Sequence, residues 1–91
     1  MYWIYFLNMF FTYILQSQKS GRYYIGHTQD IESRINRHNQ GMVKATKSKG
    51  PWVLVYQEQF DTKIEANRRE LEIKSKKSRL YIEKLIQSLN I

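Results

Sequence analysis

The sequence predicts an α+β domain in which an antiparallel or mixed three-stranded β-sheet is flanked by helices, in the order β-β-α-β-α-α. Short runs rich in aromatic and β-branched residues alternate with stretches in which apolar residues recur at helical spacing. Polar segments that contain glycine, or the breaker Gly50-Pro51, separate these runs. The length of 91 residues suits one domain with a modest core.

The N-terminal run, residues 1–15, is strongly apolar and carries no charge. A membrane-spanning helix needs about 20 consecutive apolar residues, and this run ends at Gln16. A secretory signal needs a basic start and a small-residue cleavage site, which the run lacks. We therefore expect no membrane span. Because Met9 is a second potential start, we interpret residues 1–8 as an optional extension and 9–91 as the domain.

The first two strands are expected to form a hairpin over residues 11–16 and 22–27, with a polar turn at 17–21. If the turn is centred on residues 19–20, Tyr13 lies opposite Gly26.

The same register places Leu15 opposite Tyr24, so Tyr13 and Tyr24 become diagonal neighbours on one face of the hairpin. A slip of one residue would put the two rings on opposite faces.

A helix follows, which Asp30 can cap and which should run to about Asn39. Ile31 and Ile35 form its apolar stripe. The third strand is predicted over Trp52–Phe60.

Two helices complete the predicted domain. Residues 62–65 match the capping-box pattern and should open a helix that reaches Lys76 or Lys77. Ser78 can cap a last helix to about Leu89, and its apolar positions are Leu80, Ile82, Leu85, Ile86 and Leu89.

The charge balance favours a polyanionic partner. Fifteen Lys and Arg stand against eight Asp and Glu, and the formal net charge is +7. Nucleic acid is the simplest such partner, and a well-solvated or ribosome-adherent basic protein is the alternative. The absence of cysteine excludes disulfides and thiolate metal sites, so a metal must bind through oxygen or imidazole. It also favours a cytoplasmic location.

A set of spaced motifs then resembles the GIY-YIG nuclease family, and in particular its small stand-alone bacterial members. Tyr23-Tyr24-Ile25-Gly26 contains the YIG half of the signature, and Thr12-Tyr13-Ile14 takes the place of the GIY half without its glycine. Arg34 follows Tyr24 by ten residues and His38 follows Arg34 by four. The stretch 66–70, which ends at Glu70, looks like the helix that carries the family's metal-binding glutamate.

The resemblance implies a role for each of these residues. Tyr13 would be the general base, Tyr24 would orient water and phosphate, and Arg34 would stabilise charge on the phosphate. His38 would relay a proton or bind the phosphate. Glu70 would be the sole protein ligand of Mg²⁺ or Mn²⁺. A free phenol has a pKa of about 10, which Arg34 or a metal would lower.

Each role has a simpler alternative. Tyr13 and Tyr24 could be ordinary sheet aromatics, and Glu70 could simply pair with Lys74 one helical turn away. His27 is a secondary candidate, because strand alternation puts it on the opposite face from Gly26. The predicted nucleic-acid contacts are His27, Lys44, Lys47, Lys49, Arg69, Lys74 and Lys77, with Arg68, Lys76 and Arg79 nearby.

These observations predict a metal-dependent endonuclease that cuts DNA, favoured over RNA, with structure-selective or weak specificity. The alternatives are a non-catalytic nucleic-acid-binding module of the same fold and a basic protein-interaction factor. We expect a monomer or weak homodimer. The sequence leaves DNA repair, recombination and mobile-element processing open as alternative pathways. The side chains of Tyr13, Tyr24, Arg34, His38 and Glu70 should converge on one concave basic surface.

Overall fold

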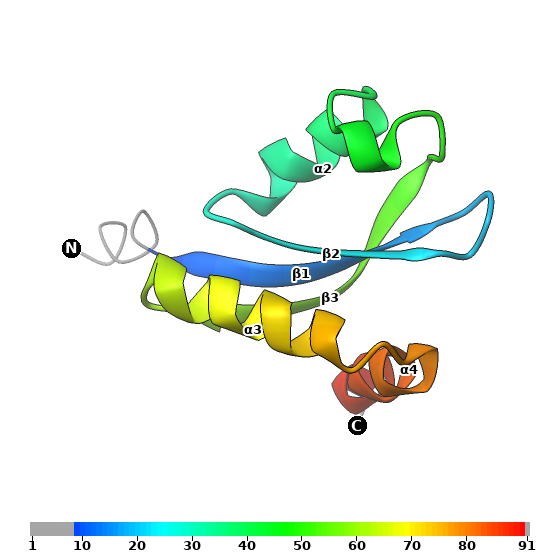
Figure 1. The fold of residues 1–91 in the computed structure, drawn as a ribbon. Helices are drawn as coiled ribbons and strands as arrows, with labels where there is room; N and C mark the ends of the chain where they lie inside the picture. Colours follow the sequence, from blue (N-terminus) through cyan, green and yellow to red (C-terminus); the bar gives the residue numbers. More distant parts are fainter. Residues whose placement is uncertain (1–8, 91) are drawn as a thin grey trace.

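The structure, a computed structural model, describes residues 9–90. It confirms the predicted fold class and element order. The sheet comprises β1 (Phe10–Ser17), β2 (Tyr23–Thr28) and β3 (Trp52–Phe60). It lies between helix α2 on one face and helices α3 and α4 on the other (Figure 1). The helices span Ile31–Asn39 (α2), Lys63–Ser75 (α3) and Arg79–Gln87 (α4), with short 3₁₀ turns at Lys44–Thr46 (η1) and Ser88–Asn90 (η2).

The extension predicted for residues 1–8 lies outside the described residues. Within residues 9–90, no helix combines the length and the apolar character that crossing a membrane requires.

The central strand of the sheet is β1, because the strand order is β2-β1-β3 and both pairings are antiparallel. The predicted hairpin register is confirmed: Tyr13 lies opposite Gly26 and Leu15 lies opposite Tyr24. The pairing of β1 with β3 shifts by one residue after Ile14, an irregularity that the sequence pattern did not reveal. β2 is therefore an edge strand with helices on both of its faces.

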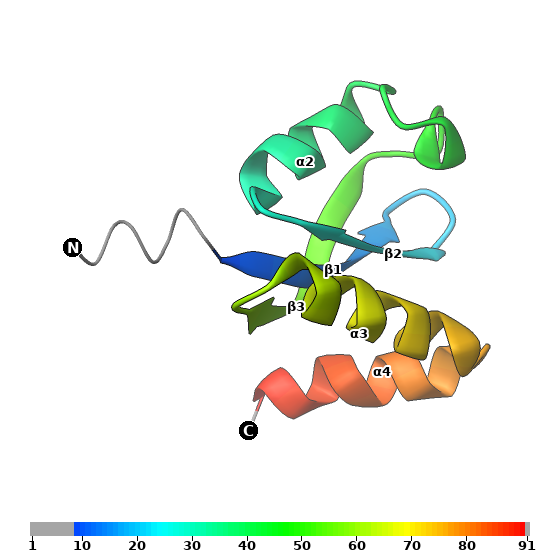
Figure 2. The same cartoon turned by 60° about the vertical axis from the view of Figure 1, so that its left-hand side comes forward.

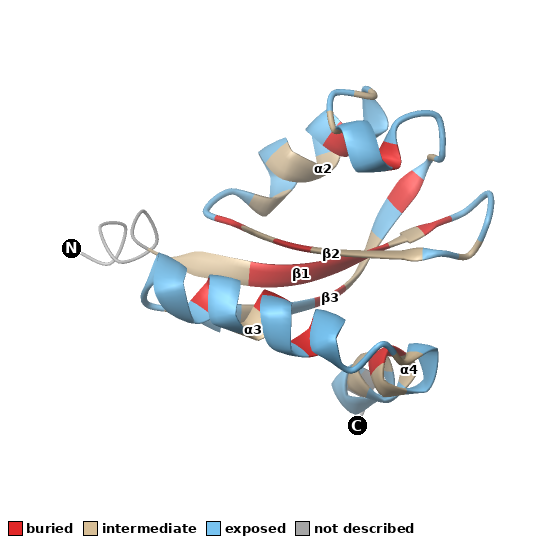
Figure 3. Cartoon of the chain, in the orientation of Figure 1, coloured by how far each residue is buried: buried red, intermediate tan, exposed pale blue. Residues whose placement is uncertain are grey.

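Alternation along β1 divides the interior into two apolar clusters. Tyr13 and Leu15 face α2 and pack with Trp52 of β3. Ile14 faces α3 and α4 and packs with Ile73 of α3. Figure 3 shows β1 as the most continuously buried strand, with the outer faces of the helices exposed. A strand that is buried on both faces tends to be apolar throughout, and β1 follows this tendency from Phe10 to Leu15 except at Thr12.

All three predicted helix caps are confirmed. The Asp30 side chain accepts from the backbone N–H of Ser33, and the Ser78 side chain accepts from that of Tyr81. Thr62 accepts from the backbone N–H of Glu65 at 3.2 Å and donates to its carboxylate at 2.8 Å. Such caps satisfy backbone donors that have no partner within the helix, which explains why the helices begin where they do.

The two C-terminal helices end slightly before the predicted residues. Helix α4 follows α3 on the same face of the sheet (Figure 2), and the two helices run in different directions, since Figure 1 shows α3 lengthwise and α4 end-on. The core face of α4 contains Ile82, Leu85 and Ile86. Two of the five predicted apolar positions are wrong as core positions, because Leu80 and Leu89 are 61% and 55% exposed. Leu80 lies in the first turn of α4, and Leu89 lies in η2, after the last residue of α4.

Arg69 joins three elements instead of facing solvent. Its guanidinium donates to Glu58 of β3 at 2.8 Å, to Glu72 of α3, and to the Tyr81 hydroxyl of α4 at 3.2 Å. These contacts engage the side chain fully and leave 18% of it exposed. Two carboxylates, those of Glu58 and Glu72, therefore already pair with the charge of Arg69, and its contact with nucleic acid stays a prediction.

We expect Arg69→Ala to lower the free energy of unfolding by about 1–3 kcal/mol, because the half-buried carboxylate of Glu58 loses its cationic partner and keeps only the Tyr56 hydroxyl as a donor, while the Tyr81 hydroxyl loses the donor that Arg69 supplies. The matched control is Arg68→Ala, which removes the same side chain at an exposed neighbouring position and should change stability by less than about 0.5 kcal/mol. Urea unfolding of both variants measures the difference. Equal stability of the two variants would contradict the structural role of Arg69.

Candidate active site

Three rings meet between the sheet and α2. The Tyr13 hydroxyl lies 3.0 Å from Nε2 of His38. The centroid of the Tyr24 ring lies 6.4 Å from that of Tyr13 and 4.7 Å from that of His38. Tyr13 and His38 are each 2% exposed. The structure therefore brings together three of the five residues selected from the sequence, with direct contact between the phenol and the imidazole.

Gly26 explains why the second motif ends in glycine. A Cβ atom at Gly26 would lie 2.5 Å from the Tyr13 hydroxyl and 2.7 Å from its Cζ atom. No side chain fits at such separations, so the absence of a Cβ makes room for the phenol over the edge strand. The Tyr13 ring can therefore lie over β2 only because its cross-strand partner is glycine.

His38 is held at both ring nitrogens. Nε2 meets Tyr13, and Nδ1 lies 2.8 Å from the hydroxyl oxygen of Thr46 in η1. Burial, reinforced by the charges of Arg34 and Arg37, lowers the pKa of His38 to about 4. The imidazole is therefore neutral near pH 7, so one ring nitrogen is free to accept a hydrogen bond.

The pKa of Tyr13 moves in the opposite direction from the one expected. Burial raises it well above its ordinary value, and neighbouring Tyr24 raises it further. Arg34 does lower the pKa of Tyr13, as predicted, but burial outweighs this effect. Tyr13 therefore stays protonated near pH 7, and it can take a proton from water only if its own proton passes to another group.

Arg34 faces a cleft of about 420 Å³ at the place where β2 ends and α2 begins. Within residues 9–90, its guanidinium forms no hydrogen bond or ion pair. The cleft contains three cationic side chains and one carboxylate, and its lining comprises Phe10, His27, Thr28, Gln29, Asp30, Ser33, Arg34, Arg37 and Lys63. An unpaired guanidinium in such a cleft can bind two phosphate oxygens at once.

Glu70 lies on the other face of the sheet. Its carboxylate accepts a hydrogen bond from Nδ1 of His27 at 2.6 Å and pairs with Lys74 one turn along α3. The expected convergence on one surface is therefore incomplete, since Glu70 makes no direct contact with Tyr13 or Tyr24 within the described part of the chain. Its charge nevertheless raises the pKa of Tyr13, so the two groups interact electrostatically across the edge of the sheet.

The opposite-face placement predicted for His27 is confirmed, and it explains the contact with Glu70. Side chains at even positions of β1 and odd positions of β2 face α3, as Ile14 and Ile25 show. His27 shares this orientation and meets the helix at Glu70. Strand alternation together with the position of α3 could have predicted this pair.

Thr12 is a functional candidate that the motif comparison did not select. It occupies the place of the family's glycine, is fully buried, and donates to the carbonyl of Ala66 in α3 at 2.7 Å. Glu70 lies one helical turn beyond Ala66. The Thr12 hydroxyl therefore connects the strand of Tyr13 to the helix of Glu70, which accounts for a polar residue at this motif position.

The donor set for a divalent metal is small. Within residues 9–90, no three His, Asp or Glu side chains gather into a metal-binding group. Glu70 is a single buried carboxylate, with His27 beside it. Mg²⁺ often uses one or two carboxylates and fills its remaining positions with water and substrate phosphate, so these residues fit a weak site that substrate completes.

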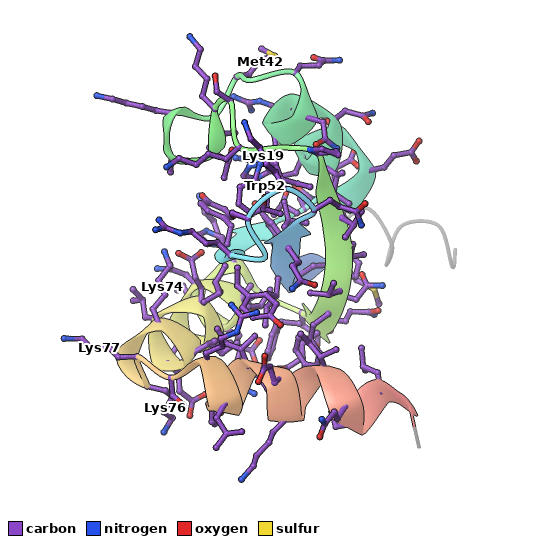
Figure 4. All side chains as sticks on the ribbon, turned by 90° about the vertical axis from the view of Figure 1, so that its right-hand side faces the viewer. Lys19, Met42, Trp52, Lys74, Lys76 and Lys77 are labelled. Carbon is purple, nitrogen blue, oxygen red and sulfur yellow. The ribbon has the colours of Figure 1, made fainter. Side chains whose placement is uncertain are left out.

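The predicted basic contacts fall into separate groups. Lys44, Lys47 and Lys49 are exposed around η1. Lys77 projects outward at the end of α3, beside Lys74 (Figure 4). A second groove of about 360 Å³ lies there, lined by Arg22, Tyr23, Ile25, Ile73, Lys74, Lys77, Ser78, Arg79 and Ile82.

We expect the stability of the protein to fall on acidification because of His38. An unfolded histidine takes a proton near pH 6.5, whereas folded His38 does so only at about pH 4. Between these values the unfolded chain binds more protons, so lowering the pH favours it, by roughly 2–4 kcal/mol in total. Unfolding of the wild type and of His38→Gln across this range isolates the effect. An NMR titration midpoint of His38 near 6.5 would contradict the prediction.

The chain is similar to several known proteins. The sequence matches a family model described as the GIY-YIG catalytic domain over residues 9–85. A UPF0213 protein of Staphylococcus saprophyticus is 49% identical over 70 residues, which cover 76% of this chain and 84% of that protein. A UPF0213 protein of Staphylococcus aureus is 41% identical over 83 residues, with coverage of 86% and 100%.

A solved structure resembles the chain as well. The solution NMR structure of a UPF0213 protein from Bacillus halodurans has a TM-score of 0.55 and 38% sequence identity, and the match covers 87% of this chain and 83% of that one. The family model spans the hairpin, the buried Tyr13–His38 pair and the helix of Glu70 within one continuous match. On this basis the chain belongs to the GIY-YIG family of nuclease domains.

Proposed function

We propose that this chain is a divalent-metal-dependent endonuclease that hydrolyses phosphodiester bonds in DNA with structure-selective or weak specificity. The observation that carries the proposal is the buried hydrogen bond between Tyr13 and neutral His38 beside the unpaired guanidinium of Arg34. An aromatic cluster that only stabilises the fold does not require an arginine without an ion-pair partner beside it. Phosphodiester hydrolysis requires both a proton acceptor and a cation at the phosphate.

The proposed reaction begins with the phosphate in the cleft of Arg34. Arg34, with Arg37 and Lys63 at the same cleft, neutralises charge on the phosphate oxygens. Tyr13 accepts a proton from the attacking water while it passes its own proton to Nε2 of His38. Tyr24, whose ring touches both, helps to orient the water and the phosphate.

Glu70 is the proposed ligand of Mg²⁺ or Mn²⁺, and His27 is beside it. A bound divalent ion supplies charge neutralisation at the phosphate and increases the acidity of coordinated water. Lys74 pairs with the same carboxylate and is 47% exposed, so it can move aside when the site is used. His27 steadies the carboxylate from the edge strand, as partners of metal ligands commonly do.

The proposed nucleic-acid contacts follow the edge of the sheet that β2 forms. The cleft with Arg34 lies at one end of β2, and the groove with Arg22, Lys77 and Arg79 lies at the other. Glu70 lies between the cleft and the groove, because it contacts His27, which lines the cleft, and Lys74, which lines the groove. Contacts of this kind bind phosphates without reading base sequence, which supports weak specificity.

A non-catalytic nucleic-acid-binding module is the second candidate. One observation favours it: both carboxylate oxygens of Glu70 already have partners within the protein. In such a module the pairs of Glu70 would serve stability alone. Salt-sensitive binding without cleavage of any substrate would support this candidate over the nuclease.

The nuclease proposal is tested by incubating the protein with branched, flapped and linear DNA and with RNA, in Mg²⁺ or Mn²⁺. We expect nicking of at least one DNA substrate, and a decrease in kcat of about 100- to 1,000-fold in Arg34→Ala, because a cation at the developing charge is lost. Lys84→Ala is the control, because it removes a cation at an exposed position of α4 outside the predicted contacts, and it should cleave like the wild type. Equal cleavage by Arg34→Ala and Lys84→Ala would contradict the role of Arg34.

Glu70→Gln tests the metal assignment separately. This variant keeps the size of the side chain and removes its charge, so we expect metal-dependent cleavage to be lost. Circular dichroism establishes that the variant is folded. Full cleavage activity in folded Glu70→Gln would rule Glu70 out as the metal ligand.

A further inference from the structure

A chain of hydrogen bonds runs inward from Tyr13 through His38 to η1. The distances are 3.0 Å from the Tyr13 hydroxyl to Nε2 of His38, 2.8 Å from Nδ1 of His38 to Oγ1 of Thr46, and 3.3 Å from Oγ1 of Thr46 to the carbonyl of Val43. Tyr13, His38 and Thr46 are 2%, 2% and 1% exposed. Solvent therefore does not compete for these bonds, and their directions follow from the protein groups alone.

The last link sets the direction of the chain. The carbonyl of Val43 can only accept, so the Thr46 hydroxyl donates to it. The Thr46 oxygen is then left as an acceptor, and Nδ1 of His38 must donate to it. A neutral imidazole carries one proton, so Nε2 has a free lone pair and accepts from the Tyr13 hydroxyl.

The reversed direction satisfies fewer groups. If Nε2 of His38 carried the proton, it would donate to the Tyr13 oxygen. The phenol proton would then have no acceptor among the bonds found in the described part of the chain, at a site that is almost fully buried. A buried donor without a partner costs about 1–3 kcal/mol, which favours the first direction.

The backbone around Thr46 holds its hydroxyl in place. The Thr46 carbonyl accepts from Nε1 of Trp52 at 3.1 Å and from the backbone N–H of Lys49 at 3.2 Å. Trp52 in turn donates its backbone N–H to Asn39, the residue that follows His38 in α2. The histidine and the threonine are thus fixed to one another through the first residue of β3.

We propose that Thr46 is a positioning residue, whose hydroxyl holds His38 in the tautomer protonated at Nδ1 and so keeps Nε2 ready to receive the proton of Tyr13. This role rests on the proposed nuclease function and adds a residue to it. It also assigns a part in the reaction to η1, which the sequence singled out only as a basic surface.

The proton balance of the step is complete. The water oxygen forms a bond to phosphorus, and the bond from phosphorus to the leaving oxygen breaks. One water proton moves to the Tyr13 oxygen as the phenol proton moves to Nε2 of His38, so Tyr13 is unchanged and His38 becomes an imidazolium. The imidazolium then donates at both nitrogens, to Tyr13 and to Thr46, and the leaving oxygen takes its proton from solvent. After the product leaves, Nε2 of His38 returns its proton to Tyr13 as Tyr13 releases one to solvent, which restores the neutral pair.

The tautomer itself is the direct test, and it requires no substrate. Two-bond ¹H–¹⁵N correlation spectra of the wild-type protein at pH 7 distinguish a protonated Nδ1 from a protonated Nε2. We expect His38 to carry its proton on Nδ1. A proton on Nε2 overturns the proposal, whether or not the protein cuts DNA.

Variants of Thr46 then separate position from packing. Thr46→Val keeps the shape and removes the hydroxyl, and we expect it to increase the share of the Nε2-protonated tautomer and to lower kcat by about 10- to 100-fold with KM unchanged. Thr46→Ser is the matched control, which keeps the hydroxyl, loses a methyl group, and should retain the wild-type tautomer and most of kcat. The proposal is overturned if both variants show the wild-type tautomer.

Loss of the nuclease function is distinguishable from loss of this proposal. A wild-type protein that cuts no substrate but has the Nδ1-protonated tautomer, with Thr46→Val shifting it, contradicts the nuclease and supports the role of Thr46 in setting the tautomer. If Thr46→Val fails to fold, the wild-type spectrum and the Thr46→Ser spectrum decide the matter.

Discussion

The arrangement of the molecule depends on the alternation of two adjacent side chains in β1. Thr12 points to one face of the sheet and donates to the carbonyl of Ala66 in α3, whereas Tyr13 points to the other and bonds to His38 in α2. Both are buried, so neither contact can be replaced by water. A slip of one residue in the hairpin would exchange the two and break both contacts at once. The central strand therefore determines where both helices present their polar side chains.

The features that follow from local rules could be predicted from the sequence. Tyr13 lies opposite Gly26 because the length of the hairpin turn and the two-residue period of a strand determine which residues pair. The helix caps at Asp30, Thr62 and Ser78 form because their side chains can accept hydrogen bonds from the first turn of each helix. Each of these depends on residues close together in the chain.

The features that could not be predicted depend on what the fold brings together. Arg69 and Lys74 are both basic residues of α3, yet the first connects β3 to α4 and the second pairs with Glu70 at the edge of the sheet. Helical spacing alone does not reveal which face of α3 is covered. The pKa of Tyr13 was also misjudged, because the sequence shows that Arg34 is near but does not show that burial outweighs it. Thr46 had no motif to mark it, and its contact with His38 appears only when η1 folds back on α2.

The separation of Glu70 from the aromatic cluster has a consequence for the proposed chemistry. Glu70 and Tyr13 lie on opposite faces of the sheet, and β2 is the strand at whose edge the two faces meet. Their charges interact, since Glu70 raises the pKa of Tyr13. A phosphate bound at this edge would lie between the carboxylate of Glu70 on one face and the Tyr13–His38 pair on the other. The absence of a side chain at Gly26 keeps the intervening strand thin.

In the proposed reaction, burial and Arg34 together determine when a proton can pass from Tyr13 to His38. In the free protein both Tyr13 and His38 are neutral, because burial disfavours the charged form of each, and a neutral hydrogen-bonded pair costs little to bury. Arg34 adds an asymmetry, since its positive charge favours a phenolate at Tyr13 and disfavours an imidazolium at His38. An anionic phosphate bound to Arg34 would offset that positive charge, so Arg34 would no longer lower the pKa of His38. In the proposed reaction, the basicity of His38 is in this way coupled to bound phosphate: the imidazole is a weak acceptor while the cleft is free of phosphate, and it would become a stronger one with the phosphate in place.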